Sequence, residues 1–394
     1  MQFNAVISNV HHPEYGVMTI PFPIPSEQYD DIVEMLNALE IGDAVKRDCG
    51  VDEVRDGWPV LKQLERTTVN LDELDYLAKR LDSFDEYEAV QFQAATAKLG
   101  IHGAAELINL TFCCQEATVI TDFSNLDKVG RRHYLTLGGG ASMDEMQGID
   151  FQATAKALID HEVGSITPFG VIYENGMEMS NAYNGRSFPE YRYADCLMVL
   201  EMRSRFATEV NPSTYLYLPM TKSQIERTMH RAGIDSYDDM SLSFMESEFP
   251  EEVDVALDFR YESLGSLNNM CEAISALEQS DREKLGAAVV FAKPDCANEI
   301  TELAKNLELF DFIPKVRTRE EYGKYMIIES GHFEYDENLV GYFDFARYGA
   351  DRMEKEYGAF TDRGYISYHG TLSIDELMFG NQGERLDMQM GYME

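Results

Sequence analysis

Residues 71–134 read LDELDYLAKRLDSFDEYEAVQFQAATAKLGIHGAAELINLTFCCQEATVITDFSNLDKVGRRHY, and this stretch recurs later in the chain. Moved forward by 193 positions without a gap, it falls on residues 264–327, LGSLNNMCEAISALEQSDREKLGAAVVFAKPDCANEITELAKNLELFDFIPKVRTREEYGKYMI. Identical pairs are sparse, and apolar positions also coincide. The identities include Leu71 with Leu264, Leu74 with Leu267, Glu106 with Glu299, Leu110 with Leu303 and Gly130 with Gly323. Any two amphipathic helical regions share some of this pattern, so matches outside the block are needed to decide.

Two such matches lie on either side of the block. Residues 167–172 correspond to residues 361–366 at an offset of 194, through a Thr, a Gly and an Ile. Upstream, residues 23–29 correspond to residues 219–225 at an offset of 196. A nearly constant offset predicts duplication of a unit of about 190 residues and not a short repeat array. We therefore expect a first module over 1–196, a second over 197–380, and a flexible tail over 381–394.

Negative charge is the dominant feature of the composition. Seventy Asp and Glu oppose 33 Lys and Arg, which gives a net charge of -37. The two predicted modules share this excess evenly, so it is not an acidic tail. Self-repulsion of this size destabilises a compact fold, although solubility or a high-salt habitat can account for it. Since DNA carries one phosphate per ~1.7 Å, the same charge corresponds to about 63 Å of duplex. A surface of this sign excludes general nucleic-acid binding and suits a partner that itself binds nucleic acid.

The sequence also indicates a compartment. The start, Met1-Gln2-Phe3-Asn4, lacks the basic and apolar regions of a signal peptide. No apolar run approaches the ~18 residues of a membrane span, so we expect no contact with a membrane. The six Cys show no Cys-x-x-Cys spacing and are read as reduced, mostly buried thiols of a cytoplasmic protein.

Local patterns predict an α+β fold with a small helical bundle in each module. Alternation over 1–25 predicts β structure, a helix follows over 27–39 with Ser26 as its cap, and 50–59 reads as an acidic loop. Three further cap signals begin helices. These signals are Asn70 with Glu73, Ser280 with Glu283, and Thr318 with Glu321. Short strands are expected after each bundle, at 171–173 and 365–368, and the single Trp, Trp58, is expected to anchor a core.

Catalytic patterns are weak. The His residues lack zinc-ligand spacing, and the Gly-rich loop at 138–140 lacks the Lys of a phosphate-binding loop. A loose cation site at Glu334, Asp336 and Glu337 is the strongest metal candidate, and it too is weak. We therefore expect no enzyme activity, no catalytic residue, no cofactor and no metal. What remains is the carboxylates, because acids four apart on a helix are separated by ~6 Å, the scale of successive phosphates along a strand.

A resemblance to a known family gives these carboxylates a role. Residues 331–349, GHFEYDENLVGYFDFARYG, resemble the hallmark segment of the ArdA antirestriction family. That segment has a Leu, then an aromatic-Ile-Asp-aromatic core, then a Tyr followed by a small residue. The matching residues here are Leu339, Tyr342, Phe343, Asp344, Phe345, Tyr348, Gly349 and Asp351. Ala346 and Ala350 depart from the pattern, where an acid and an Arg are usual.

The resemblance is clear over 214–378 and reaches the first module only through the internal repeat, whose hallmark segment has decayed to 138–155. It divides the second module into an α/β part (214–262), a helical part (263–329) and an α+β part with the hallmark segment (330–378). The whole chain is similar to long ArdA-like proteins of Firmicutes conjugative elements, with two tandem ArdA-like modules. The fold implied is an elongated, multi-domain acidic rod that imitates bent B-form DNA.

The function implied is inhibition of type I restriction-modification enzymes by occupation of their DNA-binding groove, which protects incoming mobile DNA. An alternative from another class is an acidic mobile-element protein that binds a different basic DNA-binding partner. The resemblance also implies module pairing through the hallmark segment, as a homodimer or as a pseudo-dimer within one chain.

Target binding and module pairing each have their own candidate residues. The target-binding carboxylates predicted as phosphate mimics are Asp72, Asp75, Asp82, Asp85, Glu86, Glu88, Asp281, Glu283, Asp295, Glu299, Glu302, Glu308, Asp311, Glu320, Glu321, Glu334, Asp336, Glu337, Asp344 and Asp351. The residues predicted to pair modules are Leu339, Tyr342, Phe343, Phe345 and Tyr348.

Overall fold

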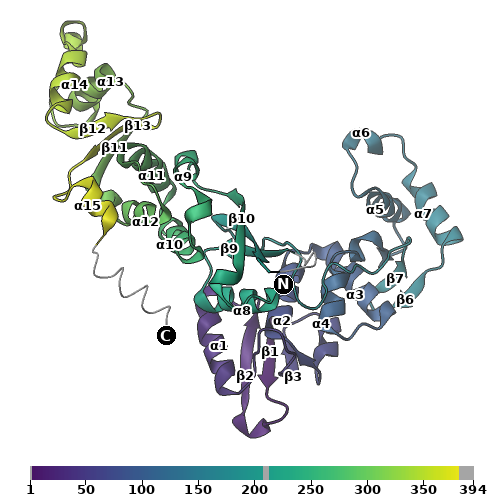
Figure 1. Ribbon diagram of the computed structural model, residues 1–394. Coiled ribbons are helices and arrows are strands. Elements are labelled where there is room, and N and C mark those ends of the chain that lie inside the picture. The colour runs from purple at the N-terminus through teal and green to yellow at the C-terminus, as the bar shows by residue number, and fades with distance from the viewer. Residues whose placement is uncertain (1, 207–212, 381–394) are drawn as a thin grey trace. The chain divides into compact units, whose positions relative to one another are not determined.

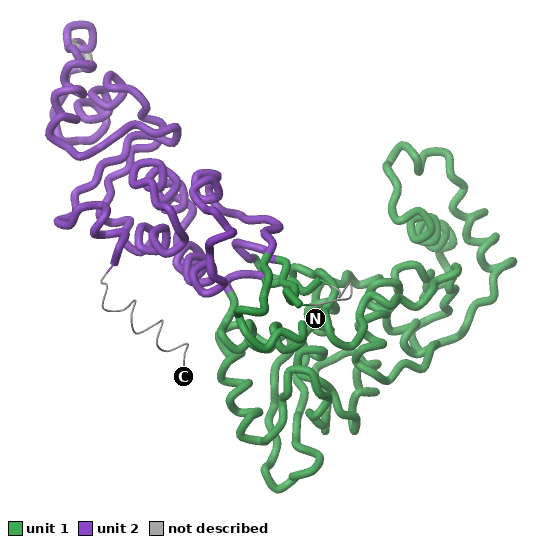
Figure 2. The backbone as a smooth tube through the Cα atoms, in the orientation of Figure 1, with its two compact units in different colours: residues 1–195, 201–216, 220–242 green, residues 196–200, 217–219, 243–394 purple. Residues whose placement is uncertain are grey.

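The computed structural model describes residues 2–206 and 213–380, and the predicted tail over 381–394 lies outside them. Helices and small sheets alternate along the chain, which confirms the predicted α+β class (Figure 1). The chain divides into two compact units (Figure 2). Unit 1 holds residues 1–195, 201–216 and 220–242, and unit 2 holds residues 196–200, 217–219 and 243–394. Unit 1 therefore includes a helix that lies beyond the predicted module border at 196.

Unit 1 begins with an antiparallel sheet in the order β2-β1-β3-β4. Its strands are β1 (Phe3–Ser8), β2 (Val17–Phe22), β3 (Cys49–Arg55) and β4 (Thr68–Val69). The predicted β structure of 1–25 is confirmed, but the predicted acidic loop is wrong, because β3 occupies most of it. Val51 and Val54 of β3 are buried while Asp52 and Glu53 face solvent, and a bulge at Asp52 of β3, opposite Val6 and Ile7 of β1, breaks the simple alternation.

Helix α1 (Tyr29–Ala38) lies between β2 and β3 in the sequence and begins three residues after its predicted cap. Ser26 lies instead in a 3-10 turn over Ser26–Gln28, so the prediction of Ser26 as a cap is wrong. The next three helices form the first bundle. They are α2 (Leu71–Asp82), α3 (Glu86–Leu99) and α4 (Ala104–Leu110). Asn70 accepts hydrogen bonds from the backbone N–H groups of Asp72 and Glu73, which confirms it as the cap of α2.

Trp58 is half-buried against Phe84 and Phe92, with ring centroids 6.5 and 5.9 Å away, and packs on the core as predicted. After α4 the chain forms a second sheet, in the order β5-β7-β6. Its strands are β5 (Thr118–Ile120), β6 (Ser165–Thr167) and β7 (Gly170–Tyr173). Three helices lie between β5 and β6 in sequence. They are α5 (Leu126–Gly138), α6 (Met143–Met146) and α7 (Phe151–His161).

A third sheet has the order β10-β8-β9, and its residues are divided between the two units. Its strands are β8 (Met198–Ser204), β9 (Thr214–Leu218) and β10 (Met240–Ser247). Helix α8 (Lys222–Ala232) belongs to unit 1 and begins at a capping box formed by Thr221 and Gln224.

Unit 2 continues with a helical bundle and a fourth sheet, in the order β11-β13-β12. The helices are α9 (Glu251–Ala256), α10 (Leu264–Ser275), α11 (Gln279–Ala292), α12 (Ala297–Lys305), α13 (Arg319–Lys324), α14 (Phe345–Met353) and α15 (Ile374–Phe379). The strands are β11 (Phe310–Pro314), β12 (Tyr357–Phe360) and β13 (Gly364–Tyr368). The Thr318–Glu321 capping box of α13 is confirmed. The one at Ser280 is wrong, because α11 begins at Gln279 and Ser280 is already helical.

The same order of elements occurs twice along the chain. Helices α2 and α10 have 12 residues each, α3 and α11 have 14 each, and each pair begins 193 positions apart. The sheet orders also correspond, since β5-β7-β6 matches β11-β13-β12 and β2-β1-β3 matches β9-β8-β10. These correspondences support the predicted tandem modules, which stay a prediction.

Helices α13 and α14 pack through their backbones. A Cβ placed on Gly323 would lie 2.0 Å from the carbonyl oxygen of Phe345, and one on Gly349 would lie 2.0 Å from that of Arg319. In unit 1, a Cβ on Gly130 of α5 would lie 1.7 Å from the carbonyl oxygen of Phe151 of α7. Glycine is therefore required at this helix contact for steric reasons, in both units.

We expect Gly349→Ala to lower the free energy of unfolding by about 1–3 kcal/mol, because the added methyl group must push α13 and α14 apart. Urea unfolding followed by circular dichroism measures this. Gly341→Ala, in the same segment but with open space around the new Cβ, is the matched control and should change stability little. Equal stability of the two variants would contradict the close helix contact.

Candidate target-binding surface

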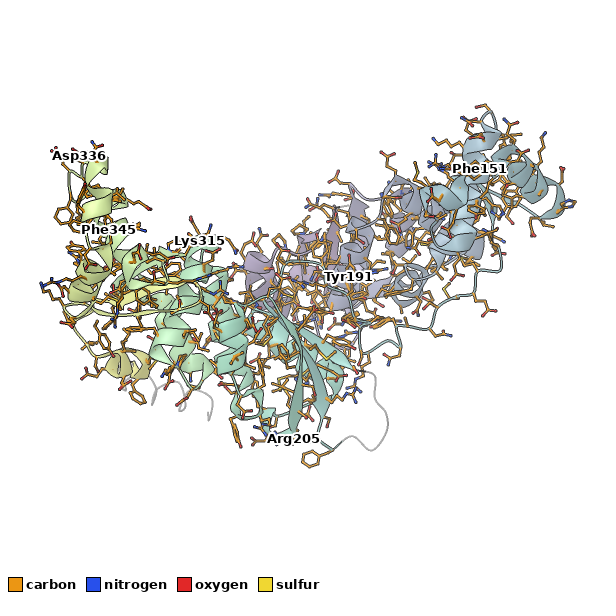
Figure 3. The ribbon with its side chains drawn as sticks, turned by 90° about the horizontal axis from the view of Figure 1, so that it is seen from above. Phe151, Tyr191, Arg205, Lys315, Asp336 and Phe345 are labelled. Carbon is orange, nitrogen blue, oxygen red and sulfur yellow. The ribbon has the colours of Figure 1, made fainter. Side chains whose placement is uncertain are left out.

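The hallmark segment, residues 331–349, lies in unit 2 and runs into the first part of α14. It contains a 3-10 helix over Glu337–Tyr342 and then Asp344, whose carboxylate accepts a hydrogen bond from the backbone N–H of Arg347 and so caps α14. Figure 3 shows Asp336 at the tip of this segment and Phe345 where the chain returns into α14. The sequence Phe343-Asp344-Phe345 therefore places a helix cap between two aromatic rings.

Aromatic rings pack on one another within the segment. Phe343 lies with its centroid 4.9 Å from that of Phe345 and 6.0 Å from that of Tyr348. Tyr335 joins the same group at 6.2 Å from Phe343, and within the described part of the chain its buried hydroxyl has no hydrogen-bond partner. Aromatic pairs at these distances stabilise by ~0.5–1.5 kcal/mol beyond the area they bury. The cluster gives the segment a small core of its own.

The residues predicted to pair modules differ in exposure. Phe345 is buried, Tyr348 is half-buried, Phe343 is 37% exposed and Tyr342 is 91% exposed. The side chain of Leu339 lies outside the described part of the structure. Phe345 and Tyr348 therefore serve the module itself, while Tyr342 is free to contact a partner.

Most of the predicted carboxylates reach solvent. The exposed ones are Asp85, Glu86, Glu283, Asp295, Glu308, Asp311, Glu320, Glu321, Glu334, Asp336, Asp344 and Asp351. The half-buried ones are Asp82, Glu88, Asp281, Glu299 and Glu302. The side chain of Glu337 lies outside the described residues. Charge on the exposed group is available to a partner over both units.

Several of these carboxylates also hold the backbone. Asp85 and Glu88 form the capping box of α3, and Glu299 accepts the backbone N–H of Asp295. Hydrogen bonds from the backbone N–H of Arg317 and from Thr318 lower the pKa of Glu321. Such a carboxylate stays ionised to lower pH than an ordinary surface Glu, which suits a surface that must remain negative.

Two of the predicted target-binding carboxylates are buried and cannot contact a partner. Asp72 and Asp75 are 9% and 5% exposed. Asp72 pairs with Arg227, and Asp75 accepts the backbone N–H of Ile24 and pairs with Lys79. The cap at Asn70 turns the first turn of α2 inward, so both charges are neutralised inside unit 1. We remove them from the candidate surface.

Part of the chain that contains this surface matches a known protein family. Residues 212–367 match the family model of the antirestriction protein ArdA. This region is ArdA-like. It contains α8 to α14 with the hallmark segment, and it covers less than half of the chain. No curated protein matches the sequence.

Two exposed acids near the start of the chain were not among the predicted carboxylates. Asp31 and Glu34 lie on the outer face of α1, in the first part of unit 1. Sequence reasoning selected acids mainly within the repeated block and the hallmark segment, so it passed over this helix. The pattern that could have found them is the alternation of these acids with the buried Ile32 and Leu36.

The two inward-facing arginines of α8, Arg227 and Arg231, were also missed. Both are buried within unit 1, where they bind groups on and around α2. With ~3.6 residues per turn, they lie on the side of α8 opposite the buried Ile225 and Met229, so both sides of the helix are covered. A helix sequence alone does not show that its polar side is buried as well.

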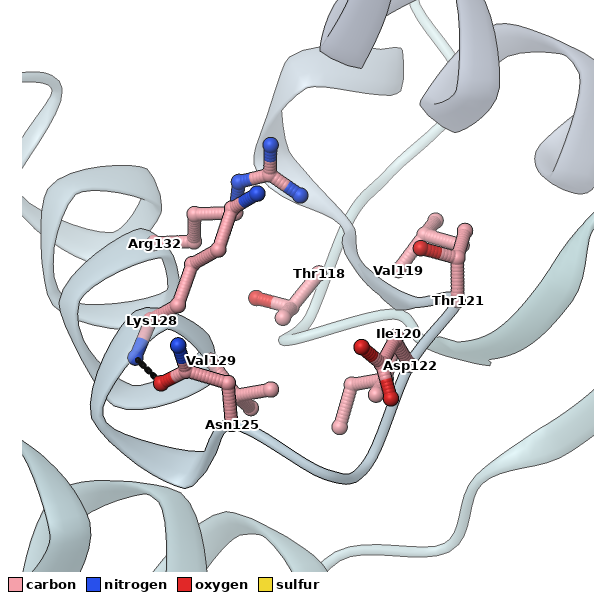
Figure 4. A pocket seen from close by; sticks show the side chains of 9 residues that line it. All are labelled: Thr118, Val119, Ile120, Thr121, Asp122, Asn125, Lys128, Val129 and Arg132. Carbon is pink, nitrogen blue, oxygen red and sulfur yellow. Dashed lines mark hydrogen bonds between the residues drawn. The ribbon is translucent and has the colours of Figure 1, made fainter.

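A small pocket of about 50 Å³ lies beside α5 in unit 1 (Figure 4). Its lining residues are Thr118, Val119, Ile120, Thr121, Asp122, Asn125, Lys128, Val129 and Arg132. Small-molecule sites usually measure ~300–1,000 Å³, so this pocket has room for a few waters and not for a substrate.

Among residues 2–206 and 213–380, no group of three His, Cys, Asp or Glu could hold a metal ion. Within the same residues, no helix is long and apolar enough to cross a membrane.

We expect Tyr342→Asp to weaken pairing through the ArdA-like region while helix content is preserved. Burial of a large apolar side chain contributes ~1.5–3 kcal/mol, and a carboxylate in its place would oppose association. Light scattering and circular dichroism measure the two effects. Tyr261→Asp, another strongly exposed Tyr of unit 2, is the control and should leave the mass unchanged. Loss of inhibition with an unchanged particle mass would show that Tyr342 contacts the target and not another module.

Proposed function

We propose that this chain is an antirestriction DNA mimic that inhibits type I restriction-modification enzymes. In this proposal, exposed carboxylates occupy the positions of DNA phosphates in the enzyme's DNA-binding groove. The observation that carries it is the combination of an ArdA-like region with a net charge of -37. The protein acts by binding and not by catalysis, and it requires no cofactor.

The distribution of charge supports this mechanism. Within the ArdA-like region, Asp295, Glu308 and Asp351 are exposed, as are most of the other predicted carboxylates there. A DNA-binding groove is lined by Lys and Arg that release counterions from DNA when they bind it. A folded surface that already presents fixed negative charge is complementary to such a groove and is repelled by nucleic acid itself.

We further propose that the chain consists of two tandem ArdA-like modules, over 1–196 and 197–380, and that it acts in the cytoplasm on behalf of a mobile element. The corresponding helices and sheets of the two halves support the tandem arrangement. The six cysteines are all free thiols, as a reducing compartment would keep them. Pairing between two chains, or between modules of one chain, fits the exposed Tyr342.

A second candidate is an acidic mobile-element protein that binds another basic DNA-binding partner. The exposed Tyr342 and Val340 favour it, because apolar side chains do not imitate phosphate and fit a partner with an apolar contact. A purified type I enzyme separates the two candidates. We expect the chain to block its DNA cleavage and its DNA binding in competition with duplex DNA. No effect on either would reject the first candidate.

We expect inhibition to weaken steeply as salt concentration rises. A contact that replaces DNA phosphates should follow the linear dependence of log affinity on log salt concentration that DNA binding itself follows. Titration of enzyme with the chain at several NaCl concentrations gives the slope, and duplex DNA titrated under the same conditions is the reference. A flat response would contradict electrostatic mimicry and favour an apolar contact.

We expect no single carboxylate to dominate inhibition. Exposed charge pairs contribute ~0–1 kcal/mol each, so Asp295→Asn alone should weaken inhibition by about fivefold or less. Neutralising eight exposed acids of the ArdA-like region together should weaken it by several orders of magnitude. The eight are Glu283, Asp295, Glu308, Asp311, Glu320, Glu329, Glu334 and Asp351.

The matched control exchanges Asp for Glu and Glu for Asp at the same eight positions, which keeps every charge and alters every side chain. This variant should inhibit nearly as well as the original chain. If one neutral substitution abolished inhibition with the fold intact, a single dominant contact residue would replace the distributed surface.

A further inference from the structure

Helix α8 inserts two arginines into unit 1. Arg227 and Arg231 lie one turn apart and are 8% and 4% exposed. They face the first turn of α2, and α8 also packs against α1, where the Thr221 hydroxyl donates to Asp30 at 2.7 Å (Figure 1). A buried cation is stable only when paired and hydrogen-bonded, so its partners define what the helix can dock on.

Arg227 forms a bidentate ion pair with Asp72. Its Nε donates to Oδ1 at 3.0 Å and its Nη2 to Oδ2 at 3.0 Å, while Nη1 donates to the carbonyl oxygen of Gly42. The hydroxyl of Tyr29 donates to the same carboxylate at 2.7 Å. Burial by itself lowers the pKa of Arg227, but attraction by Asp72 outweighs it, so the pKa is raised and the guanidinium stays charged.

Arg231 binds a second set of groups around the cap of α2. Its Nη1 donates to Oδ1 of Asn70 at 2.9 Å and to the carbonyl oxygen of Ala44 at 2.7 Å, and its Nε donates to the carbonyl oxygen of Arg186 at 2.8 Å. The guanidinium also lies over the ring of Phe188, 4.2 Å from the centroid. These partners come from three separate stretches of residues 1–196.

The corresponding positions of the other module lack these groups. At the offset of 193, Asn70 and Asp72 of α2 correspond to Ser263 and Gly265 of α10. At the offset of 196, Arg227 and Arg231 of α8 correspond to Asp31 and Met35 of α1. The first module therefore carries only the accepting half of the contact, and the second carries only the arginines.

We propose that this cluster is a selective docking interface that joins the two modules of one chain. Residues 42–46, 70–72 and 183–188 of the first module form the acceptor, and α8 of the second module is its occupant. Two first modules would bring Asp31 toward Asp72, a like-charge contact, and two second modules would leave Arg227 opposite Gly265 without a carboxylate. The charges thus favour docking of a first module on a second module and disfavour docking of two identical modules.

This inference rests on the proposed tandem modules and not on the proposed target. Its test uses the full-length chain and measures hydrogen exchange and particle mass, neither of which depends on restriction inhibition. These measurements would therefore test the inference even if the chain inhibited no restriction enzyme.

The first variant, Arg227→Asp with Arg231→Met, gives α8 the residues of α1. Loss of buried charge pairs should raise amide exchange in 222–232 by at least about a hundredfold, with exchange in α10 to α12 unchanged. The mass from light scattering should also stay unchanged. Unchanged exchange in α8 would overturn the proposal, and so would a halved mass, which would show that the contact joins two chains.

The second variant, Asp72→Asn, alters only the acceptor and covers the case in which the first fails to fold. It should raise exchange in α8, whose own sequence is intact. Asp75→Asn is the matched control, since Asp75 is buried on the same helix but bonds to Ile24 and Lys79. Equal protection of α8 in these two variants would overturn the proposal.

Discussion

An excess of 37 negative charges constrains where this chain can place its cations. A carboxylate removed from water is strongly destabilising unless a cation and hydrogen bonds accompany it. Most acids therefore stay exposed, and the few that are buried each receive a partner. Asp72 is bound by Arg227, and Glu73 is bound by Arg47 and by the hydroxyl of Tyr183, each at 3.0 Å. Most carboxylates thus remain on the surface, where they outnumber the cations, and this excess is the basis of the proposed mimicry.

The hallmark segment shows that one short motif serves three physical purposes. Gly349 permits the backbone contact between α13 and α14, Asp344 caps α14, and Phe345 joins the aromatic cluster beneath. These roles are structural, so they account for the motif without any contact to a target. Tyr342 is different, because an exposed ring has no structural role in the segment.

The two halves of the chain keep the same order of elements but differ at one sheet turn, between β6 and β7 in unit 1 and between β12 and β13 in unit 2. In unit 2, Arg363 forms a two-pronged ion pair with Glu252 at 2.7 and 2.8 Å and lies against Gly286. At the corresponding position of unit 1, Phe169 packs on the hydrophobic core instead. An apolar contact and an ion pair thus occupy equivalent places in the two halves.

The sequence by itself determined the α+β class, the helices of the repeated block, the caps at Asn70 and Thr318, and the resemblance over the hallmark segment, because periodicity and capping are local properties. It failed at β3, where a bulge hides the alternation, and at Ser280, where the helix begins one residue earlier. The burial of Asp72, Asp75, Arg227 and Arg231 was decided by tertiary structure alone. A charged residue on a helix reads as exposed until its partner, here 155 positions away, is placed beside it. Local sequence cannot encode that pairing, since the partners meet only when the fold brings α8 onto α2.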